Sequence, residues 1–421
     1  MKAPKGTYDI LPDQINKWHY LEKVLHECAR RFAYKEIRTP IFEHSELFIR
    51  GVGESSDIVS KEMYTFPDRS EQKRSLTLRP EGTASSVRAL VEGKEYNKLM
   101  PVKWYYLGPM FRYSRPQTGR YRQFHQFGAE AFGGNSPYMD AEAVMLLAFI
   151  LESAGLLQFD LHLNSVGCPE CRAAYREALL DHFQPRRDQL CPDCQTRIKQ
   201  NPLRVIDCKE EECQKAIDGY PHLIDHLCQP CAIHYEQVKA ILNDNGIKFQ
   251  QDHGLVRGLD YYTNTAFEIL VPGIGAQSAI GGGGRYNGLV SASGGPDIPG
   301  VGFALGLERL LLALEQAGTP IEDPREKMIF VVAMSEQFEP EAMRFISRLR
   351  KAGLQADKDY LARSVKAQMK YADKLKAPLV VFIGESEVAE AYYTVKRMDR
   401  GSQEKINQVT AVSDLKKMME S

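Results

Sequence analysis

The sequence has almost no net charge and lacks any segment typical of export or membrane insertion. Its 54 Lys and Arg nearly balance 55 Asp and Glu, which leaves a formal net charge of −1. This balance argues against a coat of positive charge for non-specific nucleic-acid binding, although it permits local basic surfaces. The start, MKAPKGTYDILPDQ, lacks a signal-peptide core, and no run approaches the roughly 18 apolar residues that span a bilayer. We therefore expect a cytoplasmic protein with no membrane partner.

The first part of the chain is predicted to be an α+β domain. Apolar residues at helical spacing over 16–34 indicate an amphipathic helix. The segments EIRTPIF, SLTLRP and KWYYLGPMFRY favour strands of a half-buried antiparallel sheet, with Pro40 at an edge or turn. Strand alternation returns at GLVRGLDYYTNTAFEIL, and GVGFALGLERLLLALEQAG indicates a strand followed by an apolar helix that ends at Gly318.

A separate C-terminal domain is predicted beyond the charged segment TPIEDPREK, residues 319–327. The runs MIFVVAM and APLVVFIG are suited to strands covered on both faces, with helices such as EPEAMRFISRLRKAG between them. From residue 327 onward, 17 Lys and Arg stand against 13 Asp and Glu. This mild excess suits an RNA-contacting module, although ordinary soluble α/β domains share such a composition.

The nine cysteines are unevenly spread, because all except Cys28 lie between Cys168 and Cys231. They form the motifs CPEC, CPDC, CKEEEC and CQPC within charged helical pieces that indicate an insertion. In a reducing compartment such clusters indicate metal ligation more than disulfides. The spacing of the first two cysteine pairs predicts one zinc site, and the last two pairs could form a second zinc site. The alternative is that all eight are plain reduced thiols. The first set is Cys168, Cys171, Cys191 and Cys194; the second is Cys208, Cys213, Cys228 and Cys231.

A basic hairpin is predicted over FRYSRPQTGRYRQFHQ, residues 111–126, which holds four arginines and no acid. A Pro-Gln-Thr-Gly turn splits the arginines, so we expect two strands joined by a basic loop. Guanidinium groups bind phosphate oxygens bidentately, and the neighbouring aromatic rings offer faces on which a base can stack. A triphosphate or an RNA end fits this hairpin; the alternative is a solvated basic hairpin.

Other segments place charged side chains in turns or at a helix start. TLRPEGT sets Glu81 beside Pro and Gly, where it can face an ammonium or hydroxyl group, and GLVRGLDYY holds Arg257 in a Gly-flanked turn, where it can stabilise charge on a phosphate. GLERL puts Arg309 at the start of a helix. The alternative for Glu81 is a solvated turn. The alternative for Arg309 is a surface salt bridge. GGGGRYNGL is interpreted as a segment that brings backbone close to a ligand, with a mobile loop as the alternative.

The order of these segments resembles the histidyl-tRNA synthetase family of class II aminoacyl-tRNA synthetases over essentially the whole chain. The resemblance rests on KGTYDILP, IRTPIFEHSELFIRGVGESSDIV, TLRPEGT, FRYSRPQTGRYRQFHQFGAE, LVRGLDYYTNTAFE and GFALGLERLLL. It implies an antiparallel sheet flanked by helices and a homodimer. The implied domains are a catalytic domain over 1–325, with a helical insertion at about 168–235, and an α/β anticodon-binding domain over 327–421.

The resemblance also implies a two-step reaction, in which histidine is activated by ATP with Mg²⁺ and passed to the histidine tRNA. Arg112 and Arg257 are the implied catalytic residues, and Arg115 and Gln117 would meet the tRNA acceptor end. The implied histidine-binding residues are Glu81, Thr83, Gln126, Glu130, Tyr261 and Tyr262, and the ATP-binding residues are Arg112, Arg120 and Arg309.

One position departs from the family pattern. The family has Phe-Arg-x-Glu in the basic hairpin, where this chain has Ser114. A serine cannot supply the charge-assisted hydrogen bond of a carboxylate, so we expect weaker ATP binding or a compensating neighbour. Two alternatives remain for the whole protein: the non-catalytic regulatory subunit of ATP phosphoribosyltransferase, and a zinc-dependent RNA-binding module.

Overall fold

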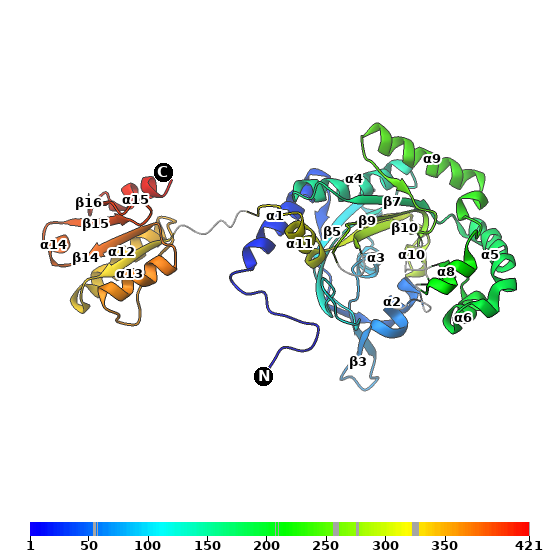
Figure 1. The fold of residues 1–421 in the computed structure, drawn as a ribbon, viewed down its shortest axis with the longest axis horizontal. Helices are drawn as coiled ribbons and strands as arrows, with labels where there is room; N and C mark the ends of the chain where they lie inside the picture. Colours follow the sequence, from blue (N-terminus) through cyan, green and yellow to red (C-terminus); the bar gives the residue numbers. More distant parts are fainter. Residues whose placement is uncertain are drawn as a thin grey trace. The chain divides into compact units, whose positions relative to one another are not determined.

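The computed structural model describes residues 1–53, 56, 58–206, 208, 210–255, 261–274, 278–321 and 328–420. The chain divides into two compact units, Met1–Ile321 and Glu322–Ser421. The expected fold class is confirmed, with a mostly antiparallel sheet and helices in the first unit and a smaller α/β sheet in the second (Figure 1). Among the residues described, none of the helices is both long and apolar enough to cross a bilayer.

Within the described residues, eight strands of the first unit form one sheet in the order β1-β5-β6-β11-β10-β9-β7-β8. All neighbours are antiparallel except the edge pairs β1 with β5 and β7 with β8, which are parallel. The bounds are β1 Lys35–Glu36, β5 Val102–Phe111, β6 Gln123–Phe132, β7 Asp160–Ser165, β8 Gln250–Gln251, β9 Thr263–Leu270, β10 Ala279–Arg285 and β11 Gly300–Gly306.

The two faces of this sheet have different chemistry because strand side chains alternate. In β6, Phe127, Ala129 and Ala131 join an apolar core together with Trp18 and Leu147 from the helices that cover that face. Gln126 and Glu130 have the opposite parity and face the other side. The covering helices are α1 (Ile15–Arg31), α4 (Pro137–Ser153), α9 (Gln229–Asp244) and α11 (Leu307–Gln316).

The opposite face carries smaller elements, and two strand expectations are corrected there. EIRTPIF is split, because β1 pairs with β5 whereas Phe42–His44 (β2) pairs with β4. SLTLRP contributes β4 (Ser75–Leu78) to a separate sheet of order β2-β4-β3 and not to the sheet of β5. The other elements on this face of the large sheet are β3 (Tyr64–Pro67), α2 (Ser45–Val52), the π-helix Ile58–Glu62, α3 (Thr83–Glu92) and α10 (Leu289–Ala292).

The cysteine-rich segment is helical and has a core of its own. Tyr175, Phe183, Ile198 and Val205 are buried there with the cysteines. Its helices are α5 (Pro169–Phe183), α6 (Pro192–Gln200), α7 (Leu203–Ile206) and α8 (Glu211–Ile217), with short 3₁₀ turns at Gln184–Gln189 and Leu223–His226. The segment lies between β7 and α9, so it is inserted into the chain path of the larger unit (Figure 1).

The C-terminal unit is a five-stranded sheet of order β13-β12-β14-β15-β16. Strand β12 runs parallel to β13 and β14, and β15 and β16 continue antiparallel. Both faces are covered, because Val331 and Val381 join a core with α12 and α15, whereas Phe330 and Val380 join a core with α13. The strands are β12 Ile329–Ala333, β13 Ala356–Lys358, β14 Leu379–Ile383, β15 Tyr392–Arg397 and β16 Gln403–Asn407; the helices are α12 Glu339–Lys351, α13 Val365–Lys374, α14 Glu385–Ala389 and α15 Ala411–Glu420.

Candidate active site

The basic hairpin is formed by β5 and β6, and its loop joins Phe111 to Gln123. Arg112 lies at its base, where Nε donates a 2.8 Å hydrogen bond to the carbonyl oxygen of Pro80 and the guanidinium carbon lies 5.2 Å from the centre of the Phe124 ring. These contacts tie Arg112 to the TLRPEGT segment. Arg115 and Gln117 are exposed in the loop, away from the base.

Glu81 closes the N-terminus of α3. Its carboxylate accepts hydrogen bonds from the backbone N–H groups of Thr83 at 2.6 Å and Ala84 at 2.9 Å. The carboxylate thereby satisfies donors that an α-helix leaves free in its first turn. Burial raises the pKa of Glu81 above its usual value, and these hydrogen bonds and nearby Arg112 act against the shift.

Glu130 is fully buried beneath this turn. It accepts hydrogen bonds from Thr83 Oγ1 at 2.6 Å, from the Tyr286 hydroxyl at 2.5 Å and from the Tyr106 hydroxyl at 3.3 Å. Burial raises the pKa of Glu130 to about 8, because a low-dielectric site disfavours the carboxylate. Gly302 opposite leaves room for the group, since a Cβ there would lie 1.9 Å from Oε2 of Glu130.

A cavity of about 340 Å³ lies between the hairpin base and the centre of the sheet. Its wall holds carboxylate, hydroxyl and amide groups together with three arginines. The wall includes the predicted residues Glu81, Thr83, Arg112, Arg120, Gln126, Tyr261, Tyr262 and Arg309.

Several predicted residues are not in this wall. Glu130 lies behind it and acts on it through Thr83. Arg115 and Gln117 lie at the exposed end of the hairpin. Arg257 falls outside the residues that the structure describes.

The three arginines form a cationic part of the cavity wall, which we call the arginine wall. Burial lowers the pKa of Arg112, Arg120 and Arg309, yet a guanidinium stays protonated in proteins. Glu62 and Glu268 raise the pKa of Arg120 in opposition to its burial. The wall is therefore cationic and has two carboxylates nearby. Its guanidinium groups suit a polyphosphate, and the carboxylates suit a metal ion bound to that polyphosphate.

Helix α11 is fixed to the hairpin through Glu308. Its carboxylate accepts the backbone N–H of His125 at 2.9 and 3.0 Å and contacts His125 Nδ1 at 3.0 Å. Tyr8, from the N-terminal KGTYDILP, donates to the same carboxylate at 3.5 Å. These contacts hold the start of α11, and with it Arg309, beside the strand that carries Gln126.

Sequence reasoning missed several of these residues and misassigned one segment. Glu62, Glu268 and Glu308 line the cavity but were assigned no role, although Glu268 and Glu308 belong to the segments LVRGLDYYTNTAFE and GFALGLERLLL. Strand alternation in TNTAFEIL is the signal that could have pointed to Glu268. The glycine run 281–284 lies in strand β10, so the mobile-loop alternative is wrong, because its neighbours β9 and β11 pair with it along its length. Gly281 and Gly282 do line the cavity.

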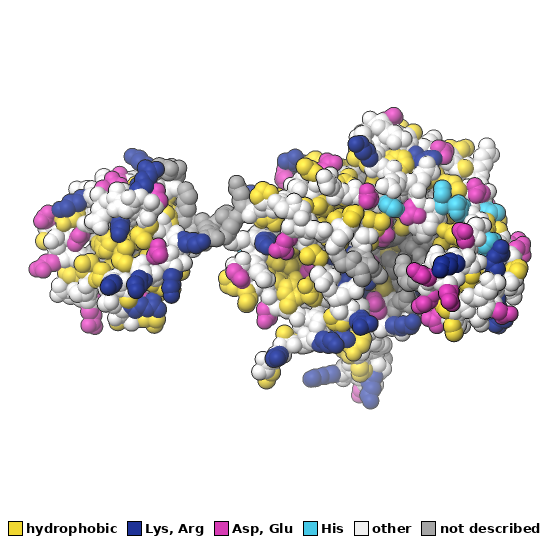
Figure 2. Space-filling view, in the orientation of Figure 1, with side chains coloured by type: hydrophobic (Ala, Val, Ile, Leu, Met, Phe, Trp, Pro, Cys, Tyr) yellow, Lys and Arg dark blue, Asp and Glu magenta, His cyan; other side chains and the backbone are white. Residues whose placement is uncertain are grey.

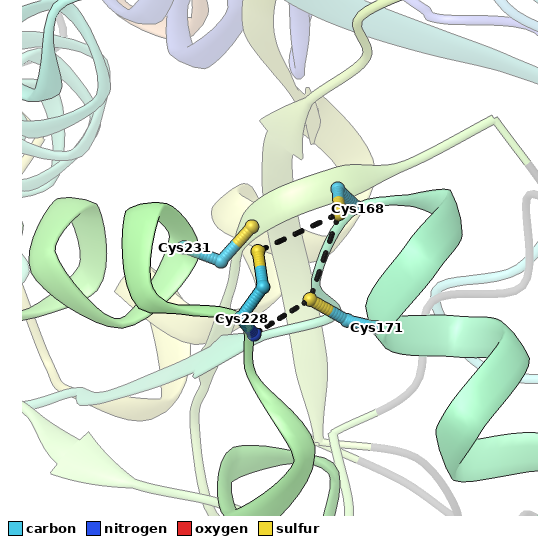
Figure 3. A group of neighbouring side chains, drawn as sticks. All are labelled: Cys168, Cys171, Cys228 and Cys231. Atoms are coloured by element: carbon cyan, nitrogen blue, oxygen red, sulfur yellow. Dashed lines mark hydrogen bonds between the residues drawn. The ribbon is translucent and has the colours of Figure 1, made fainter.

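The eight inserted cysteines form two clusters, in each of which all the sulfur atoms lie within 4.8 Å of one another. The predicted pairing in sequence order is wrong, because the sets are nested. We name the set at the two ends of the insertion the outer cluster and the set between them the inner cluster (Figure 3 draws the outer one). The outer cluster is Cys168, Cys171, Cys228 and Cys231; the inner cluster is Cys191, Cys194, Cys208 and Cys213.

Comparison with known proteins identifies the family of this chain. The family model described as Histidyl-tRNA synthetase matches residues 6–185 and 204–310, and an Anticodon binding domain matches residues 328–418. A histidine–tRNA ligase from Syntrophomonas wolfei is 58% identical over all of this chain and 99% of that relative. The chain belongs to the histidyl-tRNA synthetase family. Another member, the histidine–tRNA ligase of Moorella thermoacetica, is 54% identical over 99% of this chain and 98% of its own length.

Solved structures support the family's fold over the whole chain. The apo histidyl-tRNA synthetase of Staphylococcus aureus has a TM-score of 0.83 and 44% identity, covering 98% of this chain and 99% of that one. A Bacillus halodurans protein described as an ATP phosphoribosyltransferase regulatory subunit/histidyl-tRNA synthetase shares only the fold, with 22% identity and a TM-score of 0.64 over 88% of this chain and 96% of its own. The anticodon-binding match in the C-terminal unit favours the synthetase over the regulatory subunit.

Proposed function

We propose that this protein ligates L-histidine to the histidine tRNA at the expense of ATP, with the described cavity as its active site. In the first step the histidine carboxylate attacks the α-phosphorus, and the bond to the bridging oxygen breaks to release pyrophosphate. In the second step the tRNA 3′-terminal ribose hydroxyl attacks the carbonyl carbon of the adenylate, and AMP leaves. The observation that carries the proposal is one cavity whose wall holds both a carboxylate–hydroxyl cluster and three arginines.

The arginine wall supplies charge stabilisation. Arg112 is placed to bind the α-phosphate because it is fixed at the hairpin base by Pro80. Arg120 and Arg309 would hold the terminal phosphates with Mg²⁺, near the carboxylates of Glu62 and Glu268. We assign Arg257 to the charge that grows on the α-phosphate in the transition state, in line with the family motif LVRGLDYY. Such preorganised charges act without a protein nucleophile.

The carboxylate–hydroxyl part of the wall would bind the amino acid. Glu81 and Thr83 are placed for the α-ammonium group, and Gln126, Tyr261 and Tyr262 for the imidazole ring. Neutral imidazole has one donor and one acceptor, which a hydroxyl and an amide can both satisfy. An amino acid without these nitrogens would leave buried polar groups unpaired, which rejects it strongly. Glu130 supports this wall from behind by fixing the hydroxyl of Thr83.

The tRNA would contact the exposed loop of the hairpin and the C-terminal unit. Arg115 and Gln117 are assigned to the acceptor end, and the unit matched as an anticodon-binding domain to the anticodon. Figure 2 shows Lys and Arg side chains gathered around β3 in the first unit. Arg69, Lys73 and Arg74 are exposed in the adjoining loop. This basic surface would add phosphate contacts whose strength falls with salt. Because ribosomes use the product, the proposal places the protein in the cytoplasm.

A homodimer is part of the proposal. Ile41, Phe42 and Phe66 have exposed fractions of 45%, 53% and 40% on the small sheet of β2, β3 and β4. Phe42 and Phe66 lie in contact, with ring centres 6.5 Å apart. Exposed apolar side chains grouped in this way are typical of protein interfaces. Ile41 and Phe42 belong to the IRTPIFEHSELFIRGVGESSDIV segment, which in the family carries the dimer contact.

The metals in the proposal are Mg²⁺ bound with ATP and structural Zn²⁺ in the two cysteine clusters.

The proposed domain bounds are a catalytic domain over 1–325, an insertion at about 168–235 and an anticodon-binding domain over 327–421. The two compact units divide at Ile321.

Amino-acid-dependent exchange of pyrophosphate into ATP tests the activity. We expect exchange with histidine alone among the proteinogenic amino acids, and its loss in Arg257→Ala. A protein that binds histidine but never exchanges pyrophosphate would contradict the proposal and support the regulatory alternative. Exchange with another amino acid would contradict the assigned substrate.

A further inference from the structure

We propose that the outer cluster is a zinc clasp that closes the neck of the insertion and holds the chain segment carrying Tyr261 in the histidine pocket, whereas the inner cluster is a second zinc site that stabilises only the insertion. The link to Tyr261 rests on the proposed function, but the presence of zinc does not.

The sulfur spacing suits a metal ion held by four thiolates. A tetrahedral ion with metal–sulfur bonds of about 2.3 Å places its sulfurs about 3.8 Å apart. In the outer cluster, Cys168 Sγ lies 3.6 Å from Cys171 Sγ and 3.8 Å from Cys228 Sγ. In the inner cluster, Cys191 Sγ lies 3.9 Å from Cys208 Sγ. A disulfide needs about 2.0 Å between its sulfurs, and all eight cysteines are free.

Backbone geometry around the sulfurs also suits thiolates. Cys168, Cys191 and Cys228 are the N-caps of α5, α6 and α9, where the helix dipole favours negative charge. Backbone N–H groups donate to sulfur in both clusters, from Cys228 to Cys171 Sγ at 3.1 Å and from Cys191 to Cys213 Sγ at 3.1 Å. Such bonds orient metal ligands and partly neutralise a tetrathiolate site.

The choice of zinc follows from the size and ligands of the clusters. Four thiolates in a tetrahedral arrangement accept zinc or iron. With every sulfur within 4.8 Å of the others, each cluster encloses a single ion and is too small for several iron atoms with their bridging sulfides. Closed four-cysteine sites around one ion are typical of structural zinc.

The outer cluster closes the neck of the insertion. Cys168 and Cys171 belong to the turn and helix that follow β7, and Cys228 and Cys231 to the start of α9, where the chain rejoins the main unit (Figure 3). One ion would therefore join the segment where the chain enters the insertion to the segment where it leaves. The cysteines of the inner cluster all lie between these two segments of the chain and belong to the insertion's own core.

The clasp also contacts the strand end that leads from Tyr261. Cys231 Sγ lies 3.8 Å from Asn264 Oδ1. The backbone of Asn264 is bonded to the residues before Cys168, donating to Gly167 O at 2.9 Å and accepting from Val166 N–H at 2.7 Å. With the metal bound, the sulfur is an acceptor, and the Asn264 amide can turn its NH₂ group toward it.

Tyr261 lies between a second cavity, of about 430 Å³, and the pocket proposed for histidine. Cys168, Asn264 and Tyr261 line it together, and Tyr261 also lines the active-site cavity. Tyr261 packs against Tyr262 and Tyr286, with ring centres 4.7 and 5.8 Å away. Loss of the metal from the outer cluster would remove support from the chain segment that carries Tyr261. The Tyr261 side chain would then be less firmly positioned for histidine, which would lower the affinity.

Zinc content and histidine affinity of the full-length protein test the inference. Metal analysis should find two zinc ions per chain, and both Cys228→Ser and Cys208→Ser should lower the count to one. Calorimetry should show histidine binding weakened about fivefold or more by Cys228→Ser, whereas the matched inner-site variant Cys208→Ser should keep the wild-type affinity. Asn264→Gly keeps all eight cysteines and accepts the positive φ of this position, so it should retain two zinc ions and still weaken histidine binding.

The outcomes separate the clasp from the proposed activity. Protein without zinc, or with iron in its place, would overturn the metal assignment. Equal loss of histidine affinity in the two cysteine variants, or unchanged affinity in Asn264→Gly, would overturn the clasp. If Cys228→Ser does not fold, the Asn264→Gly result decides alone. Two zinc ions and normal histidine binding without pyrophosphate exchange would refute the proposed ligase while leaving the zinc sites standing.

Discussion

Thr83 and Glu130, 47 residues apart in the chain, are joined by a 2.6 Å hydrogen bond from Oγ1 to Oε1. The bond fastens the N-terminal turn of α3 to the central strand β6. Since Glu81 caps the same turn, the two carboxylates hold one helix end from opposite sides. The pocket proposed for histidine is therefore built around a hydrogen-bonded helix start and not around a free loop.

The pH dependence of stability should reveal the buried Glu130. Burial raises its pKa from 4.5 to about 8 in the folded state, so the folded protein binds a proton that the unfolded chain has already lost between these values. Its contribution to stability is complete below the unfolded pKa and is lost as pH rises toward the folded pKa. Wild type should lose on the order of 2 kcal/mol more than Glu130→Gln between pH 5.5 and 8.5 in denaturant unfolding. Parallel pH profiles of the two proteins would contradict this.

Arg112 should affect chemistry more than amino-acid binding. It lies at the arginine part of the cavity, and its Nε is committed to Pro80. Arg112→Ala should lower the pyrophosphate-exchange rate by about 100-fold or more, as for the loss of a preorganised transition-state donor. Arg112→Lys should recover little, since an ammonium cannot reproduce the guanidinium fork. Histidine affinity by calorimetry should stay near wild type, and a large loss there would instead indicate a collapsed pocket.

Ser114 should limit ATP binding. It lines the cavity where family members have a glutamate, and its short side chain cannot offer a charge-assisted acceptor. Ser114→Glu should lower the KM for ATP severalfold, with Ser114→Gln as the uncharged control. No gain from either change would show that a neighbour compensates. Glu62 in the same wall is then the residue to test, because Glu62→Gln should raise the KM for ATP.

Asp140 should be needed to keep Arg285 buried. Both side chains are fully buried, and the two Nε–oxygen distances are 3.1 Å. His234 from α9 lies 3.4 Å from the same carboxylate. Asp140→Ala leaves a buried charge unpaired and should cost about 3–5 kcal/mol in the free energy of unfolding. Combining it with Arg285→Met should restore part of that loss; an additive further loss would contradict the pairing.

Local periodicity predicted much of the fold. The helix over 16–34, the hairpin strands, and the strand–helix unit that presents Arg309 follow from patterns within a short window. The family and fold class are confirmed because several motifs occur together in the correct order. Pro40 divides EIRTPIF between two sheets, which no local pattern could assign.

The parts that sequence could not predict depend on contacts across the fold. Cysteine spacing favours neighbours in sequence, whereas folding of α5 and α9 brings Cys168 to Cys228. The burial of Glu130 depends on Tyr106, Tyr286 and the missing side chain of Gly302, which come from three other strands or strand ends. The roles of all the assigned site residues, Arg115, Gln117 and Arg257 included, stay predictions.

The nesting of the cysteine clusters sets an order of assembly. During synthesis the ribosome delivers every ligand of the inner cluster before the last ligand of the outer one, Cys231. With the proposed zinc, a growing chain could bind the inner ion and fold the insertion first, and only then bind the outer ion that closes its neck. The insertion would then be folded before the large sheet is complete, because strands β9, β10 and β11 are synthesised later.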